Sequence, residues 1–176
     1  MNTVVDHIKS HIRDIPDFPK PGILFRDITP LLQDPVAFRA VIEALAVRYA
    51  NRNLSKIVAI ESRGFVFATP LAYKLGLGFA PLRKEGKLPY ETLSEAYLLE
   101  YGQAAIEIHR DAVKKGERVL LFDDLLATGG TAAASLALLE RLGAEVVEAC
   151  FVIELTALGG RRKIVGPPVF SLVAYE

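Results

Sequence analysis

The sequence predicts an α/β fold of one domain, in which a mainly parallel central sheet is flanked by helices. Short apolar runs of the buried-strand type alternate with segments of helical periodicity, and this alternation is typical of parallel strands joined through helices. The chain has 176 residues, of which 51% are hydrophobic and 24% charged, and this suits one globular domain with its own core. In such folds ligands bind beyond the carboxyl ends of the strands, so functional residues are expected in the segments that follow them.

The first fifty residues are predicted to form a helix, an irregular segment and a second helix. Apolar residues at helical spacing predict a short helix over residues 3–13. Residues 15–30 contain four prolines, which exclude a regular helix, although the apolar residues between them are expected to pack on something. Asp34 and Pro35 are typical of a helix start, and the helical spacing that follows extends to about residue 51.

The rest of the chain alternates between predicted strands and helices. Strands are predicted for residues 56–60, 79–83, 105–109, 118–122, 145–153 and 169–174. Helices are predicted for residues 65–75 and 130–142, each ending at a glycine. Residues 84–100 form one unusually long connection, which suggests an active-site lid.

Charge, cysteine content and hydropathy disfavour several classes of protein. The 21 Lys and Arg residues balance 21 Asp and Glu residues, which argues against a nucleic-acid coat or a polybasic membrane binder. Cys150 is the one cysteine; it excludes an intrachain disulfide, and its apolar neighbours predict a small buried side chain. Neither a signal-peptide pattern nor a membrane-spanning apolar run is present, so a cytoplasmic protein is expected.

The most informative motif spans residues 120–131. Asp123 and Asp124 come directly after a predicted buried strand, at the start of a loop of small residues that leads into a predicted helix. Backbone N–H groups of such a loop can approach a ligand closely, and the helix dipole favours an anion there. The two carboxylates would repel an anion but accept hydrogen bonds from vicinal hydroxyls, so the two parts together indicate a sugar phosphate. The nucleoside-triphosphatase phosphate loop and the dinucleotide fingerprint are absent, which disfavours a kinase or a dehydrogenase.

A second candidate anion site follows other strands. Arg63 lies between a predicted strand and a predicted helix, where its guanidinium is positioned to clamp an anion. Further positive charge follows the next strand, at Arg83, Lys84 and Lys87. Residues 56–90 hold six basic and two acidic side chains, whereas residues 91–124 hold eight acidic and four basic ones. The net charge of zero therefore does not argue against a small, highly charged ligand.

Residues 119–131 resemble the phosphoribosyl pyrophosphate (PRPP) motif of the type I phosphoribosyltransferases. Other segments, spread over essentially the whole chain, are similar to the adenine branch of that family: Phe18–Leu32, Glu61–Phe65, Arg83–Pro89, Leu99–Gly102 and Glu154–Arg161. The resemblance implies one domain over residues 1–176 with the type I phosphoribosyltransferase fold. It also implies a small N-terminal hood at about residues 15–32 and a flexible active-site loop at about residues 84–101.

The resemblance implies transfer of the phosphoribosyl group of PRPP to adenine, which gives AMP and pyrophosphate in purine salvage. Mg²⁺ is implied as the cofactor, carried by PRPP near Asp123 and Asp124. These carboxylates would hold the ribose hydroxyls and stabilise the sugar cation as it forms. Glu100 would be the general base or hydrogen-bond partner for the proton of adenine, under a loop that closes against water. The family is usually homodimeric, which makes a homodimer the expected assembly.

The resemblance also assigns the binding residues. The 5′-phosphate would lie against Ala127, Thr128, Gly129, Gly130 and Thr131. The pyrophosphate would lie against Ser62, Arg63, Gly64, Arg83, Lys84 and Lys87. Members of the family often have a cis peptide at the position that here joins Glu61 and Ser62.

Adenine would lie under the hood, with Ile23, Phe25, Arg26 and Leu155 as the candidate contacts. Backbone groups of the hood would read the edge that carries the amine, and the apolar side chains would contact the ring. An aromatic residue such as Phe25 is more often part of a core than a ligand contact, so Leu155 is the preferred apolar contact. Arg26 could also be structural, in a pair with Asp27 or Asp17.

Two other functions stay open from the sequence. A PRPP-sensing regulator would bind RNA or DNA without turnover, although the segment before the hood carries few positive charges. An enzyme for guanine, xanthine or hypoxanthine would need a hood that meets a 6-oxo acceptor instead of an amine donor. Nucleic-acid retention tests the first alternative, and competition among purine bases tests the second.

Overall fold

The computed structural model describes residues 3–98 and 103–176. The chain divides into two compact units, Met1–Arg48 and Tyr49–Glu176. None of the helices in the described ranges combines the length and apolarity needed to cross a membrane.

The N-terminal unit contains a hairpin and three helices. Its elements are α1 (Val4–Lys9), β1 (Arg13–Pro16), β2 (Leu24–Asp27), α2 (Thr29–Gln33) and α3 (Pro35–Tyr49), whose last residue belongs to the second unit. The helix predicted for residues 3–13 is too long, because Arg13 instead pairs with Asp27 in the antiparallel hairpin. The predicted start of α3 is confirmed: the Asp34 carboxylate accepts hydrogen bonds from two backbone N–H groups of the first turn.

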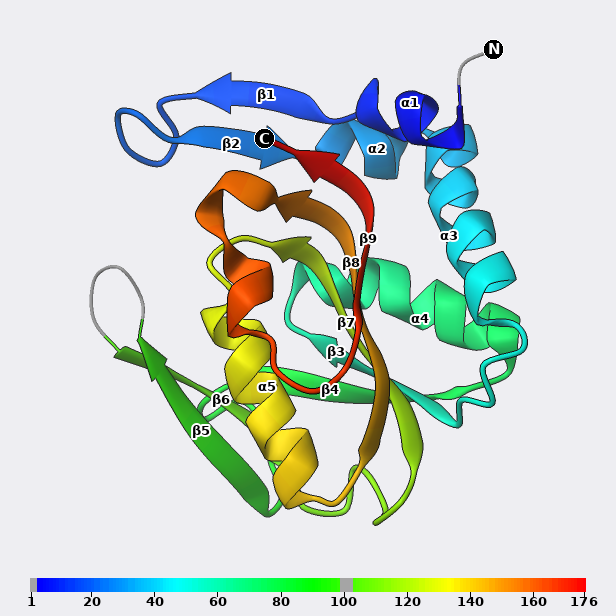
Figure 1. Cartoon of the computed structure of the whole chain (residues 1–176), viewed down its shortest axis with the longest axis vertical. Helices are drawn as coiled ribbons and strands as arrows, with labels where there is room; N and C mark the ends of the chain where they lie inside the picture. Colours follow the sequence, from blue (N-terminus) through cyan, green and yellow to red (C-terminus); the bar gives the residue numbers. More distant parts are fainter. Residues whose placement is uncertain (1–2, 99–102) are drawn as a thin grey trace. The chain divides into compact units, whose positions relative to one another are not determined.

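The second unit is built on a seven-stranded sheet (Figure 1). In spatial order its strands are β5 (Thr92–Leu98), β6 (Gln103–His109), β4 (Gly78–Lys84), β3 (Lys56–Ile60), β7 (Arg118–Leu126), β8 (Glu145–Leu155) and β9 (Val169–Tyr175). The five strands from β4 to β9 in this order are parallel, whereas β6 is antiparallel to both β4 and β5. The predicted fold class, a mainly parallel sheet flanked by helices, is confirmed.

Two strands depart from the sequence prediction. Residues 84–100 are not one connection, because β5 forms inside them by pairing with β6 from Thr92 onward. Strand β7 continues through Asp123 and Asp124, which were expected in the exit loop. It does so because β8 is long enough to pair with it as far as Leu126.

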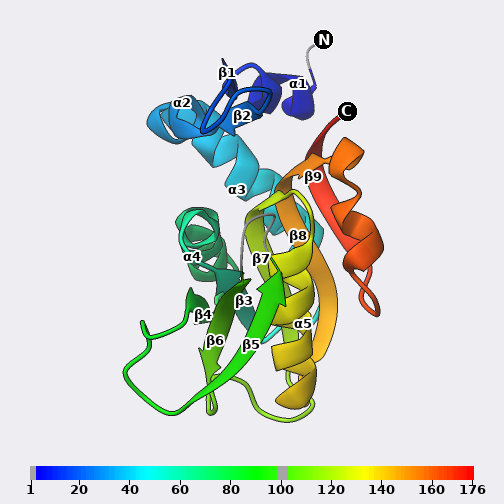
Figure 2. The same ribbon diagram turned by 90° about the vertical axis from the view of Figure 1, so that its left-hand side faces the viewer.

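Helices α4 (Arg63–Leu75) and α5 (Gly130–Arg141) lie on opposite faces of the sheet (Figure 2). The connection from β3 through α4 leads to β4 on one side, and that from β7 through α5 leads to β8 on the other. Parallel crossovers are right-handed, so connections that run in opposite directions place their helices on opposite faces. The direction reverses between β3 and β7, which is where folds of this type bind ligands.

The core between α5 and the sheet is apolar, and Leu138 of α5 is fully buried in it. Cys150 of β8 is fully buried as well, as the sequence predicts. Leu138→Ala is expected to lower the free energy of unfolding by about 2–5 kcal/mol, because the truncation leaves a cavity. Urea denaturation measures this.

The matched control is Tyr73→Ala on α4, where the side chain is 90% exposed. Its effect is expected to stay within about 0.5 kcal/mol. Equal losses in the two variants would contradict the packing of Leu138 described here.

Candidate active site

A pocket of about 400 Å³ lies at the carboxyl ends of β3, β4 and β7. It is lined by Glu61, Ser62, Arg63, Arg83, Lys84, Lys87, Asp123, Asp124 and Thr131, among others. A smaller hollow of about 80 Å³ is lined by Asp123 and by the loop from Ala127 to Thr131. Asp123 and Thr131 line both spaces, so the two adjoin. The sheet therefore gathers most of the residues that the sequence singled out as anion or diol sites.

The two adjacent carboxylates of β7 differ in exposure. Asp124 is 4% exposed, whereas Asp123 is partly exposed. The backbone N–H of Asp124 donates to Oδ1 of Asp123 over 2.8 Å. Burial and the charge of Asp124 raise the pKa of Asp123 well above its ordinary value. Burial also raises the pKa of Asp124, against the opposing effect of Arg63.

The segment after β3 packs closely on these carboxylates. The peptide between Glu61 and Ser62 is cis, as the family resemblance implies. Nε of Arg63 lies 2.8 Å from Oδ2 of Asp124. A Cβ atom on Gly64 would lie 2.9 Å from Oδ1 of Asp123, so only glycine fits there without a shift. The predicted anion clamp and the predicted diol site are thus in direct contact.

The loop from Ala127 to Thr131 leads into the N-terminus of α5. Gly129 has φ 78° at the N-cap and provides no capping side chain, which leaves the first N–H groups of the helix for other acceptors. Helix N-terminal amides of this kind favour anions. This loop is called the phosphate cradle below.

Gly160 packs against the phosphate cradle, which sequence reasoning missed. A Cβ atom on Gly160 would lie 2.2 Å from the carbonyl oxygen of Ala127, and one on Gly129 would lie 2.3 Å from the carbonyl oxygen of Gly160. Two 3₁₀ turns follow β8, at Thr156–Leu158 and Gly160–Lys163, and Gly160 begins the second of them. The Gly-Gly pair in the segment Glu154–Arg161 was the available signal for this close approach.

An ion pair closes that turn. Nη2 of Arg161 lies 2.5 Å from Oε2 of Glu154, and the Ser171 hydroxyl donates to the same oxygen over 2.6 Å. The hydrogen bonds from Arg161 and Ser171 outweigh burial and lower the pKa of Glu154. The ionised Glu154 carboxylate therefore holds the turn that places Gly160.

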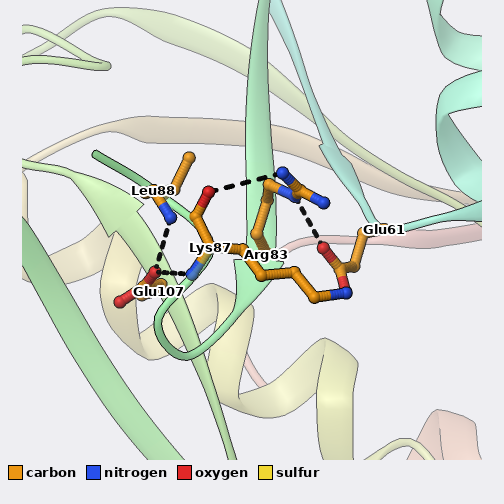
Figure 3. A network of polar contacts seen from close by, with 5 residues as sticks. All are labelled: Glu61, Arg83, Lys87, Leu88 and Glu107. Atoms are coloured by element: carbon orange, nitrogen blue, oxygen red, sulfur yellow. Dashed lines mark hydrogen bonds and ion pairs between the residues drawn. The ribbon is translucent and has the colours of Figure 1, made fainter. Parts of the chain in front are cut away.

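The basic side of the pocket is an ordered network (Figure 3). Nε of Arg83 donates to Oε2 of Glu61 over 2.7 Å, and Nζ of Lys87 donates to Oε1 of Glu61 over 2.8 Å. The buried Glu107 carboxylate accepts from the backbone N–H groups of Lys87 and Leu88. Sequence reasoning missed both glutamates, because an isolated Glu gives no local signal of its partners.

Four of the remaining predicted residues belong to other parts of the described chain, and the fifth lies outside the described residues. In the N-terminal unit Phe25 packs edge-on against Phe18, and Arg26 forms an ion pair with Asp14. The sequence left open a structural pair of Arg26 with Asp27 or Asp17, but the partner of Arg26 in this ion pair is Asp14, and Asp27 pairs with Arg13. Ile23, in the same unit, is exposed. Leu155 ends β8 in the second unit and is half-buried. Glu100 lies outside the described residues.

Known proteins resemble this chain over nearly its full length. A family model described as "Phosphoribosyl transferase domain" matches residues 27–170. The adenine phosphoribosyltransferase of Carboxydothermus hydrogenoformans is 60% identical over 168 residues, which cover 96% of this chain and 99% of that protein. The crystal structure of adenine phosphoribosyltransferase from Thermoanaerobacter pseudethanolicus matches with a TM-score of 0.94 at 54% identity, covering 98% and 100% of the two chains.

A third match was solved with ligands. It is the adenine phosphoribosyltransferase of Saccharomyces cerevisiae complexed with an imino-altritol bisphosphate and adenine. The TM-score is 0.93 at 40% identity, over 98% of this chain and 99% of that one.

Proposed function

The chain belongs to the phosphoribosyltransferases, in their adenine branch, and we propose that the pocket between β3, β4 and β7 is where it acts. The enzyme transfers the phosphoribosyl group of PRPP to adenine and forms AMP and pyrophosphate, a step of purine salvage. The observation that best supports this pocket is the order of its charged groups. Asp123 and Asp124 line it together with four basic residues, Arg63, Arg83, Lys84 and Lys87, and Asp123 also lines the hollow at the phosphate cradle. PRPP has the matching order of groups, because its ribose hydroxyls lie between a pyrophosphate and a 5′-phosphate.

Two anion subsites are proposed. The 5′-phosphate accepts hydrogen bonds from the phosphate cradle, with Ala127, Thr128, Gly129, Gly130 and Thr131 around it. The pyrophosphate lies against Ser62, Arg63, Gly64, Arg83, Lys84 and Lys87, all but Gly64 of which line the larger pocket. Several cations facing the pyrophosphate balance the negative charge that it carries in bound PRPP and as the leaving group.

The carboxylates of Asp123 and Asp124 are proposed to act on the sugar. They accept hydrogen bonds from the ribose hydroxyls and stabilise the positive charge that develops at C1′ as the bond to pyrophosphate breaks. N9 of adenine then forms the new bond to C1′. Arg63, which faces Asp124 in the structure, is close enough to the same carboxylate to balance its charge until the substrate binds.

Mg²⁺ is proposed as the cofactor, held by PRPP beside Asp123 and Asp124. Among residues 3–98 and 103–176 no three Asp, Glu, His or Cys side chains form a metal cluster. Two adjacent carboxylates nevertheless fit Mg²⁺, which is commonly bound through one or two carboxylates together with substrate oxygens. When bound, the ion would neutralise charge on the pyrophosphate.

The remaining parts of the proposal concern adenine and the assembly. We propose that Ile23, Phe25, Arg26 and Leu155 bind adenine and that Glu100 takes or shares its proton. The hood at residues 15–32, the loop at residues 84–101 and one functional domain over residues 1–176 belong to the same proposal. A cytoplasmic homodimer that binds neither nucleic acid nor membrane is the proposed state of the enzyme.

The test is a direct assay. The protein is mixed with Mg²⁺, PRPP and adenine, and AMP is measured by chromatography; AMP is expected, in amounts equal to the pyrophosphate released. Guanine, hypoxanthine and xanthine are offered in competition and are expected to give little product. Folded protein that makes no AMP from fresh PRPP would overturn the proposal.

A further inference from the structure

Glu61 is the one acidic side chain that joins both basic side chains of the Figure 3 network. The Glu61 side chain is 5% exposed, whereas the Arg83 and Lys87 side chains are 36% and 47% exposed. A buried anion thus holds two cations at the wall of the pocket. We infer that Glu61 is a positioning residue that orders Arg83 and Lys87 for the pyrophosphate of PRPP before the substrate binds, an inference that rests on the proposed function.

The backbone of Glu61 is fixed by the sheet. Its N–H donates to the carbonyl oxygen of Leu82 over 2.9 Å, which extends the pairing of β3 with β4 by one residue. Arg83 is the next residue along β4. The carboxylate and the guanidinium therefore start from adjacent, hydrogen-bonded strands, and their contact needs no loop to be ordered first.

Lys87 is fixed at both ends. Its backbone N–H donates to Oε1 of the buried Glu107 over 3.1 Å, and its Nζ donates to Glu61 over 2.8 Å. Nη1 of Arg83 also approaches the carbonyl oxygen of Lys87 at 3.4 Å. Because Glu107 holds only the backbone, the direction of the Lys87 side chain depends on Glu61.

The charge of the network remains favourable for an anion. Glu61, Arg83 and Lys87 together carry one net positive charge. The Glu107 carboxylate adds one negative charge beside the backbone of Lys87 and Leu88, whereas Arg63 and Lys84, which line the pocket, add two positive charges. Burial raises the pKa of Glu61, but the hydrogen bonds from Lys87 and Arg83 outweigh it and lower that pKa overall. Glu61 is therefore ionised at neutral pH and orders its partners without cancelling their charge.

A positioning role of Glu61 and a purely electrostatic role predict opposite changes in the affinity for PRPP when Glu61 is replaced by Gln. Removing a negative charge beside a polyanion would by itself tighten binding of PRPP. If Glu61 orders the two cations, its loss instead weakens binding, because two long side chains must then be ordered when the substrate arrives. If the substrate loses the same binding energy in the ground state and in the transition state, KM rises and kcat stays unchanged.

The experiment compares Glu61→Gln, Glu61→Asp and a matched control. The control is Glu140→Gln, which removes an exposed carboxylate near the C-terminal end of α5. Glu61→Gln is expected to raise the KM for PRPP about tenfold, with kcat changed less than about twofold. Glu61→Asp keeps the charge but shortens its reach, so it is expected to raise KM as well. Glu140→Gln is expected to leave KM unchanged.

Binding of magnesium pyrophosphate, measured by calorimetry, gives a readout independent of turnover. The Kd of magnesium pyrophosphate is expected to rise in both Glu61 variants and not in Glu140→Gln. Thermal unfolding identifies a temperature at which all the proteins are folded. Wild-type KM and Kd in Glu61→Gln, or values below wild type, would overturn the inference. Wild-type protein that makes no AMP would instead overturn the proposed function.

Discussion

Asp123→Asn is expected to lower kcat about 100-fold, the order seen when one preorganised group that stabilises transition-state charge is removed. The substitution keeps the shape of the side chain and an oxygen that can accept from the backbone N–H of Asp124. It removes the negative charge beside the developing sugar cation. Steady-state assay of AMP formation measures the effect.

The same variant is expected to unfold at a higher temperature than the wild type near pH 7. Burial and the charge of Asp124 raise the folded-state pKa of Asp123, so ionised Asp123 is less favourable in the folded chain than in the unfolded one. That cost is present above the raised pKa and disappears as the pH falls towards about 4, the unfolded value. The stability gain of Asp123→Asn is therefore expected to shrink on acidification.

The control is Asp111→Asn, which neutralises an exposed carboxylate in the turn after β6. It is expected to leave kcat and the unfolding temperature unchanged. Thermal unfolding of the three proteins between about pH 4 and 7 measures the comparison. A gain in stability that grows as the pH falls, or a wild-type kcat, would contradict the role given to Asp123.

Gly160→Ala is expected to lower kcat/KM for PRPP about 100-fold, because a displacement of about 1 Å in a binding site can cost that much. The added Cβ would lie 2.2 Å from the carbonyl oxygen of Ala127 and 2.9 Å from the backbone N of Gly129. Both contacts are with backbone, so no side chain can rotate away. The phosphate cradle or the turn after β8 must move.

Gly78→Ala is the matched control for this substitution. Its Cβ would meet the Lys56 side chain at 3.4 Å, which a flexible side chain can accommodate. Steady-state kinetics with PRPP as the varied substrate should therefore distinguish the two alanine variants. If Gly160→Ala kept the wild-type kcat/KM, the turn would not support the cradle in the way described.

Elements that depend on local sequence could be predicted closely. The strand at residues 56–60 has the predicted bounds, and α4 ends where Gly76 adopts a left-handed conformation. Asp34 caps α3 as expected. Each of these rests on hydropathy or on a residue with a strong conformational preference, and such signals need no information about distant partners.

Elements that depend on a distant partner could not be predicted. β5 was placed in a connection, because its strand character comes from pairing with β6. The extension of β7 depends on the length of β8 in the same way. Glu61, Glu107 and Gly160 were missed as parts of the site, because their contacts join segments that are far apart along the chain.

The sequence by itself determined the fold class, the family and the order of the anion-binding and diol-binding segments. The fold class can be predicted from the periodicity of apolar residues, and the family and the order of the binding segments from short motifs such as the one at residues 120–131. Only the tertiary structure decided that Arg63 faces Asp124, that Glu61 joins Arg83 to Lys87 and that Gly160 supports the cradle. Such contacts form where the ends of different strands meet. They could not be predicted from the sequence, because the packing of the strands, and not the order of residues along the chain, decides which side chains become neighbours.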